Sequence, residues 1–74
     1  VLVEPLQGRG GMRPAPDGWL RSVRELTQQH AALLAFDEIQ SGFGRTGALW
    51  ARGDVVPDLL CVGKALGGGL PLSA

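Results

Sequence analysis

Ala32-Leu33-Leu34-Ala35-Phe36-Asp37 is the stretch that decides the fold. Five consecutive apolar residues lead directly to a carboxylate. Unbroken apolar runs of this length are typical of strands covered on both faces, as in a parallel sheet flanked by helices. Two further runs, Val1-Leu2-Val3 and Leu59-Leu60-Cys61-Val62, have the same character. The sequence therefore predicts an α/β fold whose sheet is mostly parallel and covered by helices.

The segments between these runs predict a loop, a helix and a second irregular stretch. Residues 5–16 are rich in Gly and Pro, which predicts a loop. Residues 17–30 predict a helix with Asp17 as its N-cap. Its apolar positions, which share one face, are Trp19, Leu20, Val23 and Leu26. Arg24 is among the residues expected to point outward. A short helix is expected at residues 48–52.

Each apolar run is followed by a polar residue of a functional type. Glu4 follows the first run, Asp37 the second, and Lys64 stands two residues after the third. In parallel α/β sheets, ligands bind outside the carboxyl ends of the strands. We therefore expect these three side chains to face one crevice.

Lys64 is the only lysine in the chain, and its neighbours are apolar residues and glycines. A lysine confined in such surroundings loses solvation and becomes available as a neutral nucleophile toward a carbonyl. The alternative is a surface lysine whose stem lies on apolar neighbours.

Asp37 ends a strand whose other residues are apolar, so its charge needs a partner. It would either cap the following turn or face a bound cation. Together with Lys64 it would suit a pyridoxal cofactor, whose aldehyde carbon bonds a lysine and whose protonated ring nitrogen faces an aspartate.

Residues 42–47 match the letters G-x-G-x-x-G and raise the alternative of a nucleotide-binding α/β module. A dinucleotide-binding loop follows its strand directly, whereas residues 38–41 intervene here. The chain also lacks an acidic residue about 20 positions further on. We interpret the match as a consequence of the 12 glycines in the chain.

Composition excludes several classes of protein. The chain has 74 residues, one Cys and one His, so a disulfide scaffold and a zinc site are excluded and no metal ligands are expected. Seven basic and seven acidic residues balance, which argues against nucleic-acid binding. No apolar stretch approaches a membrane span. The unpaired Cys61 fits a cytoplasmic location. Its length and first residue, Val1, favour a piece of a larger protein.

Four sequence blocks resemble the class III aminotransferases of the ornithine, acetylornithine and ω-amino-acid type. These blocks are Val3-Glu4-Pro5-Leu6-Gln7-Gly8, the run from Asp37 to Gly47, Pro57-Asp58-Leu59-Leu60, and Gly63-Lys64-Ala65-Leu66-Gly67-Gly68-Gly69. The resemblance implies a fold type I enzyme that uses pyridoxal 5'-phosphate (PLP). Residues 1–74 would be a partial segment of its large cofactor-binding domain.

The resemblance also implies residue roles. Lys64 would form the Schiff base and move the proton during catalysis, while Asp37 would keep the pyridine nitrogen protonated. Ile39 would pack on the ring face, and Gln40 would reach the phenolic oxygen. Glu4 would support the site from behind these residues.

One position departs from the commonest family pattern. Arg9 stands where many members have a Glu that pairs with a substrate-binding arginine. We interpret Arg9 as a residue that tunes substrate choice or, alternatively, one that faces solvent; the donor and acceptor therefore stay open.

The implied function is transamination between an amino acid or ω-amine and a 2-oxo acid, in a homodimer. Decarboxylating transamination or an aminomutase reaction are the alternatives, since both need Asp37 and Lys64. The family's phosphate-binding loop and partner-subunit residues are not in these 74 residues. We therefore expect the isolated chain to be inactive.

Overall fold

The fold is described from a computed structural model that covers residues 1–74. Its elements, in chain order, are β1 (Leu2–Val3), β2 (Leu6–Gln7), β3 (Arg13–Pro14), α1 (Trp19–Gln29), β4 (Ala35–Asp37), β5 (Leu59–Cys61) and a 3₁₀ helix (Lys64–Gly67). None of the helices has the length and apolar character needed to cross a membrane.

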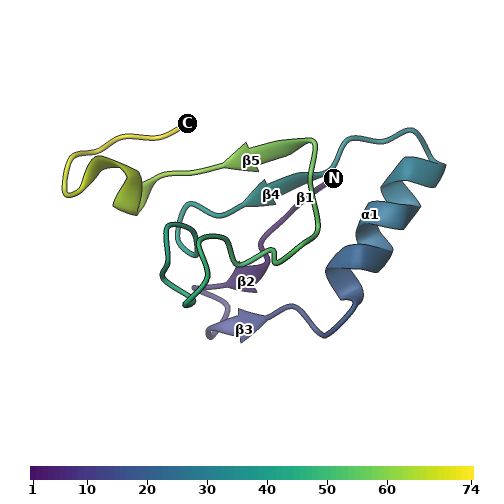
Figure 1. Ribbon diagram of the computed structural model, residues 1–74, viewed down its shortest axis with the longest axis horizontal. Helices are drawn as coiled ribbons and strands as arrows, with labels where there is room; N and C mark the ends of the chain where they lie inside the picture. The colour runs from purple at the N-terminus through teal and green to yellow at the C-terminus, as the bar shows by residue number, and fades with distance from the viewer.

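Parts of the three predicted apolar runs form one parallel sheet in the order β1-β4-β5 (Figure 1). Of the run at residues 32–36 only the last two residues belong to β4, which ends with Asp37. Val3 pairs with Phe36, and Phe36 pairs with Leu60, so these side chains form a row across the sheet. The prediction of a parallel α/β arrangement is confirmed.

Helix α1 packs on one face of this sheet. Phe36 and Leu34 are completely buried there, next to Val55. Leu20 and Val23 of α1 pack against this core. Of the four positions predicted for the apolar helix face, Trp19 and Leu26 are exposed.

The opposite face of the sheet is open within this chain. Leu2 and Leu59 are more than half exposed. The expectation of helices on both faces is therefore met on one face only, because the chain contains a single α-helix.

The start of α1 differs from the prediction. Asp17 is not the N-cap: Gly18 occupies that position with φ 77°, and no side chain caps the helix. Glycine adopts this left-handed conformation without the steric cost of a side chain. The first helical hydrogen bond is donated by the Ser22 N–H to the Gly18 carbonyl, at 3.0 Å.

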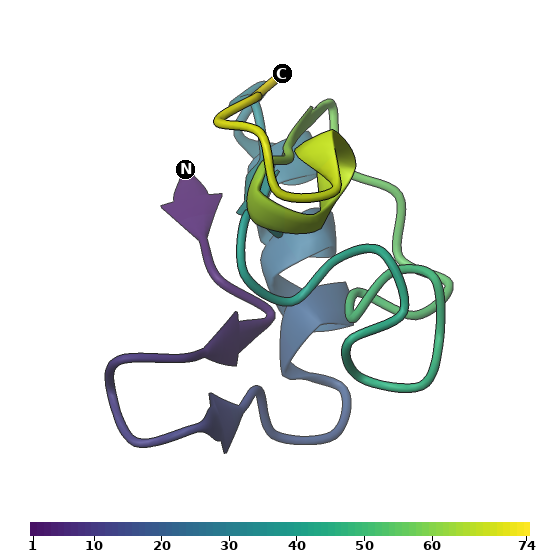
Figure 2. The ribbon, with the colours of Figure 1, turned by 90° about the vertical axis from the view of Figure 1, so that its left-hand side faces the viewer.

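Two irregular segments also differ. The predicted loop contains the antiparallel pair β2–β3, which stands apart from the sheet in Figure 2. The short helix expected at residues 48–52 is absent. The N–H groups of Ala51 and Arg52 instead donate to the carboxylate of Glu38, which replaces the helical hydrogen bonds expected there.

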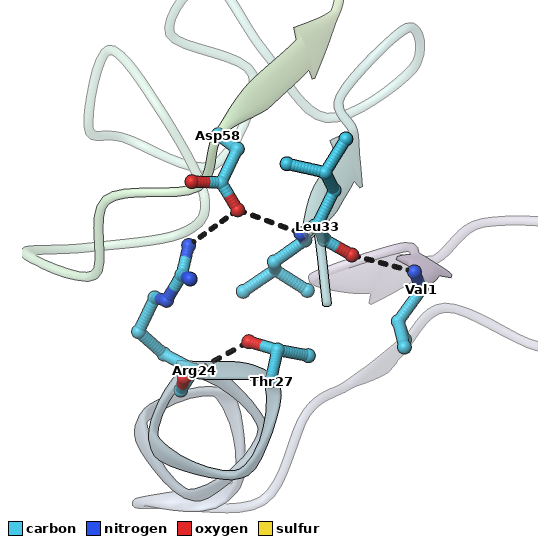
Figure 3. Close-up of polar contacts among 6 residues, drawn as sticks. Val1, Arg24, Thr27, Leu33 and Asp58 are labelled. Atoms are coloured by element: carbon cyan, nitrogen blue, oxygen red, sulfur yellow. Dashed lines mark hydrogen bonds and ion pairs between the residues drawn. The ribbon is translucent and has the colours of Figure 1, made fainter. Parts of the chain in front are cut away.

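Asp58 joins α1 to the sheet at the end of the strands remote from Lys64 (Figure 3). Its Oδ2 accepts hydrogen bonds from the Leu34 N–H and from a terminal guanidinium nitrogen of Arg24, both at 2.8 Å. Together these two donors, the Leu34 N–H foremost, lower the pKa of Asp58. The expectation that Arg24 points into solvent is wrong, since its side chain is only 15% exposed.

Candidate functional site

The site is built at the carboxyl ends of the parallel strands. Glu4 directly follows β1, and Asp37 is the last residue of β4. Asp37 is the register partner of Cys61 in β5, and Lys64 comes three residues after Cys61. Because the strands are parallel, all three predicted residues leave the sheet at the same edge.

Glu4 and Asp37 line one cavity of about 570 Å³, beside Arg13 of β3 and Trp19 of α1. Lys64, Ile39, Gln40 and Arg9 are not among its lining residues. The cavity therefore joins two of the six predicted residues.

The carboxylate of Asp37 is half-buried and partly engaged. Its Oδ1 accepts a hydrogen bond from the Ile39 N–H at 3.0 Å, which closes a tight turn after β4. The turn-capping role considered for Asp37 is thus present in the structure. Its second oxygen accepts no hydrogen bond within the chain, so one oxygen is free for a cationic group.

Lys64 begins the 3₁₀ helix and is exposed. Of the two alternatives for Lys64, the exposed surface lysine describes it in these 74 residues, because the neighbouring glycines supply no side chains and the 3₁₀ helix lies beyond the end of β5 (Figure 1). The backbone of Lys64 has φ 38°. Positive φ at a non-glycine residue is uncommon and is concentrated at functional sites.

Two glycines lie directly against the side chains of Ile39 and Gln40, the residues predicted to contact the cofactor ring. A Cβ at Gly63 would come within 3.1 Å of Ile39 Cγ2. A Cβ at Gly8 would overlap the side-chain amide of Gln40. Neither glycine has a positive φ, so the close approach of these side chains, rather than backbone conformation, favours glycine at both positions.

Glu4 precedes Gly8 by four residues in the chain, and Arg9 directly follows it. The Gly8 N–H donates to Glu4 Oε2 at 3.4 Å, a long contact, and the Glu4 side chain is exposed. Arg9 is exposed and forms no ion pair within the chain. The structure therefore places Glu4 near Gln40 through Gly8 and leaves Arg9 facing outward.

Residues 42–47 do not form a nucleotide-binding loop of the Rossmann kind. No helix follows them, and the chain passes through turns with positive φ at Phe43, Gly44 and Gly47. The dinucleotide-binding alternative loses its structural basis, because that motif needs a helix N-terminus for the pyrophosphate.

Sequence reasoning missed Glu38, which is 0% exposed. A signal was available, because side chains alternate between the faces of a strand. Leu34, Phe36 and Glu38 share one parity and are all completely buried, while Asp37 has the other parity. Glu38 therefore continues the buried row beyond the end of β4.

These residues fit a pyridoxal group. A free carboxylate oxygen on Asp37 suits a protonated ring nitrogen, and an exposed amine on Lys64 suits an aldehyde. The glycines at positions 8 and 63 leave room for Gln40 and Ile39 beside them. The fold and these residues define a parallel α/β protein with an aspartate and a lysine at the carboxyl edge of its sheet.

The comparison with protein families agrees with this class. The family described as Aminotransferase class-III matches residues 1–74. The chain belongs to the class III aminotransferases, a family of pyridoxal-phosphate enzymes.

Curated relatives match the chain over its full length. It is 53% identical to the acetylornithine aminotransferase of Methanopyrus kandleri and 55% identical to the succinylornithine transaminase of Citrobacter koseri. It covers 20% and 19% of those two proteins, respectively. The chain thus spans about a fifth of the length of these relatives.

Solved structures show the same fold. An N-acetylornithine aminotransferase from Stenotrophomonas maltophilia superposes with a TM-score of 0.93 at 57% identity, over 99% of this chain and 21% of that one. An ornithine aminotransferase from Plasmodium yoelii gives a TM-score of 0.92 at 40% identity, over 97% and 20%.

Proposed function

We propose that residues 1–74 are a segment of the large, PLP-binding domain of an aminotransferase. The whole enzyme would transfer an amino group from an amino acid or ω-amine to a 2-oxo acid. The observation that carries this proposal is the placement of Asp37 and Lys64 beyond adjacent parallel strands, in a chain that matches the family throughout. The names of the relatives favour transamination over the other PLP reactions.

The family resemblance supplies the residue roles. The bound cofactor would supply an electron-accepting ring. Lys64 would hold the cofactor through Nζ and, once the substrate amine has displaced that nitrogen, would carry a proton on it. The free oxygen of Asp37 would keep the ring nitrogen protonated, while the other oxygen stays fixed by the Ile39 N–H. Ile39 and Gln40 would hold the ring in place.

Lys64→Ala in the full-length enzyme that carries this segment tests the proposal. We expect amino-group transfer to fall by about 10³-fold or more, because the variant loses both the covalent anchor and the proton carrier. Arg21→Ala, which removes an exposed cation on α1, is the matched control and should retain activity. Unchanged activity in Lys64→Ala would refute the assigned role of the lysine.

Arg9 is proposed to tune substrate choice. It is exposed and free of ion pairs, so its guanidinium is available to a substrate carboxylate, which it would bind bidentately. Arg9→Glu reverses this charge and is expected to change the ranking of kcat/KM values across a panel of amino donors. An unchanged ranking would assign Arg9 to the solvent-facing surface.

The enzyme is further proposed to act as a homodimer in the cytoplasm. The turn at Gly67–Gly69 would pass close to the partner subunit, as the family resemblance implies. Cys61 is a free thiol, which suits a reducing compartment.

A further inference from the structure

Glu38 is a completely buried carboxylate with two short hydrogen bonds. Its Oε2 accepts from the Ala51 N–H at 2.7 Å, and its Oε1 accepts from the Arg52 N–H at 2.8 Å. A buried carboxylate without partners is strongly unfavourable, whereas N–H donors at these distances form charge-assisted bonds. Both oxygens are therefore held by consecutive residues of a turn that lies 13 residues further along the chain.

The backbone of Glu38 is held as firmly as its side chain. Its N–H donates to the Cys61 carbonyl in β5, and its carbonyl accepts from the Gly42 N–H, both at 2.9 Å. Glu38 therefore joins three parts of the chain: the end of β4, the end of β5, and the loop that follows β4.

That loop is packed tightly against Glu38. A Cβ at Gly42 would lie 2.8 Å from the Glu38 carbonyl oxygen and 2.9 Å from the Trp50 ring. The rings of Phe43 and Trp50 are 5.0 Å apart and tilted by 59°. The Phe43–Trp50 contact brings the two ends of the loop together, and the carboxylate of Glu38 binds the two residues that follow Trp50.

We propose that Glu38 is a positioning residue for the cofactor site. It stands between Asp37 and Ile39, two of the predicted cofactor contacts, and Cys61 precedes Lys64 by three residues. The carboxylate of Glu38 fixes the turn at residues 51–52, while its main-chain N–H, which any non-proline residue would supply, pairs with the end of β5. The side chain thereby holds the turn against the backbone from which Asp37 and Ile39 project. This inference rests on the proposed function and adds a residue to its site.

The carboxylate is required for this role rather than any polar group. An ionised carboxylate offers an acceptor on each oxygen, whereas the amide of glutamine offers one acceptor and turns an N–H₂ group toward the second N–H. Glu38→Gln therefore keeps the size of the side chain and loses one of its two bonds.

Asp58→Asn is the control. Asp58 is also a carboxylate that accepts one backbone N–H and one further donor, both on Oδ2, so its Asn variant loses the charge and keeps an acceptor oxygen. Asp58 directly precedes β5, away from Lys64. Both variants should lower the resistance of the full-length enzyme to urea. Only Glu38→Gln should disturb the cofactor site.

The experiment is a titration of each apo variant with PLP. We expect the dissociation constant of Glu38→Gln to rise by up to about tenfold over that of Asp58→Asn, because PLP binding must then restore the geometry that one bond to a charged group had held. An equal change in both variants, or none in Glu38→Gln, would overturn the proposal. If the wild-type enzyme itself failed to bind PLP, the proposed function would fall instead.

Phe43→Leu keeps the proposal testable if Glu38→Gln does not fold. This substitution loosens the aromatic closure of the loop and leaves the carboxylate and its two bonds in place. We expect a smaller rise in the PLP dissociation constant, about threefold, roughly the effect of one lost aromatic contact. An unchanged constant would show that the loop does not act on the site.

Discussion

At the residue scale, two adjacent carboxylates have opposite surroundings. Asp37 faces the cavity with one free oxygen, whereas Glu38 is buried with both oxygens bonded. The alternation of the strand separates them. Two consecutive carboxylates thus have different surroundings because their side chains point to opposite faces of the strand.

The contact between Gly8 and Gln40 gives a prediction at this scale. In the full-length enzyme, Gly8→Ala should lower the free energy of unfolding by about 1 kcal/mol, the low end of the overpacking range, because the new methyl group displaces only the flexible end of the Gln40 side chain. In a Gln40→Ala background the same substitution should cost much less. Urea unfolding of the four proteins in this double-mutant cycle measures the coupling, and equal costs in both backgrounds would contradict the contact.

Much of the residue-level site is predictable from the sequence. Glu4, Asp37 and Lys64 were expected to face one crevice because each follows an apolar run. Glu4 and Asp37 line one cavity, whereas Lys64 leaves the sheet at the same edge without lining it. An exposed Lys64 was one of the two alternatives predicted for this residue, whereas the burial of Glu38 was not predicted. The exposure of Lys64 depends on how far the 3₁₀ helix extends beyond β5, and the burial of Glu38 on a loop that returns to it 13 residues later.

At the element scale, the apolar runs and the helical periodicity predicted β1, β4, β5 and α1. The hairpin β2–β3 was missed because the prolines of residues 5–16 favour a loop reading. The N-cap was misplaced by one residue, since a glycine with positive φ performs the turn that a capping side chain would otherwise make. Contacts between residues distant in the sequence decide where such strands pair, and local sequence patterns do not contain them.

The bonds by which Asp58 attaches α1 to the sheet predict that the free energy of unfolding depends on pH. The Leu34 N–H and Arg24 lower the pKa of Asp58 from its ordinary value of 3.8. A carboxyl group whose pKa is lowered by folding stabilises the protein above its unfolded pKa, and this contribution is lost as the pH falls through the folded value. The stabilisation from Asp58 should therefore be complete at neutral pH and decline below about pH 3.8.

Urea unfolding between pH 7 and pH 3 compares Asp58→Asn with the wild-type protein. Their difference in unfolding free energy should shrink at the acid end of this range. Asp54→Asn is the control, because Asp54 pairs with Arg21 in a solvent-exposed ion pair and should contribute less. A difference for Asp58→Asn that stays constant with pH would argue against its carboxylate as the link.

At the scale of the whole molecule, the chain carries one edge of the proposed cofactor site on three strands of a sheet. It spans about a fifth of the length of its relatives, and one face of its sheet exposes Leu2 and Leu59. The resemblance places the phosphate-binding loop and partner-subunit residues elsewhere. The isolated 74 residues are therefore expected neither to bind PLP tightly nor to transfer amino groups.

Borohydride reduction in the presence of PLP tests the central claim most directly. It converts the bond between a lysine and a bound aldehyde into a stable adduct, which peptide mapping by mass spectrometry locates. We predict one reduced adduct on Lys64 in the full-length enzyme and no comparable labelling of the isolated chain. A full-length enzyme in which Lys64 stays unmodified while another lysine carries the adduct would contradict the account.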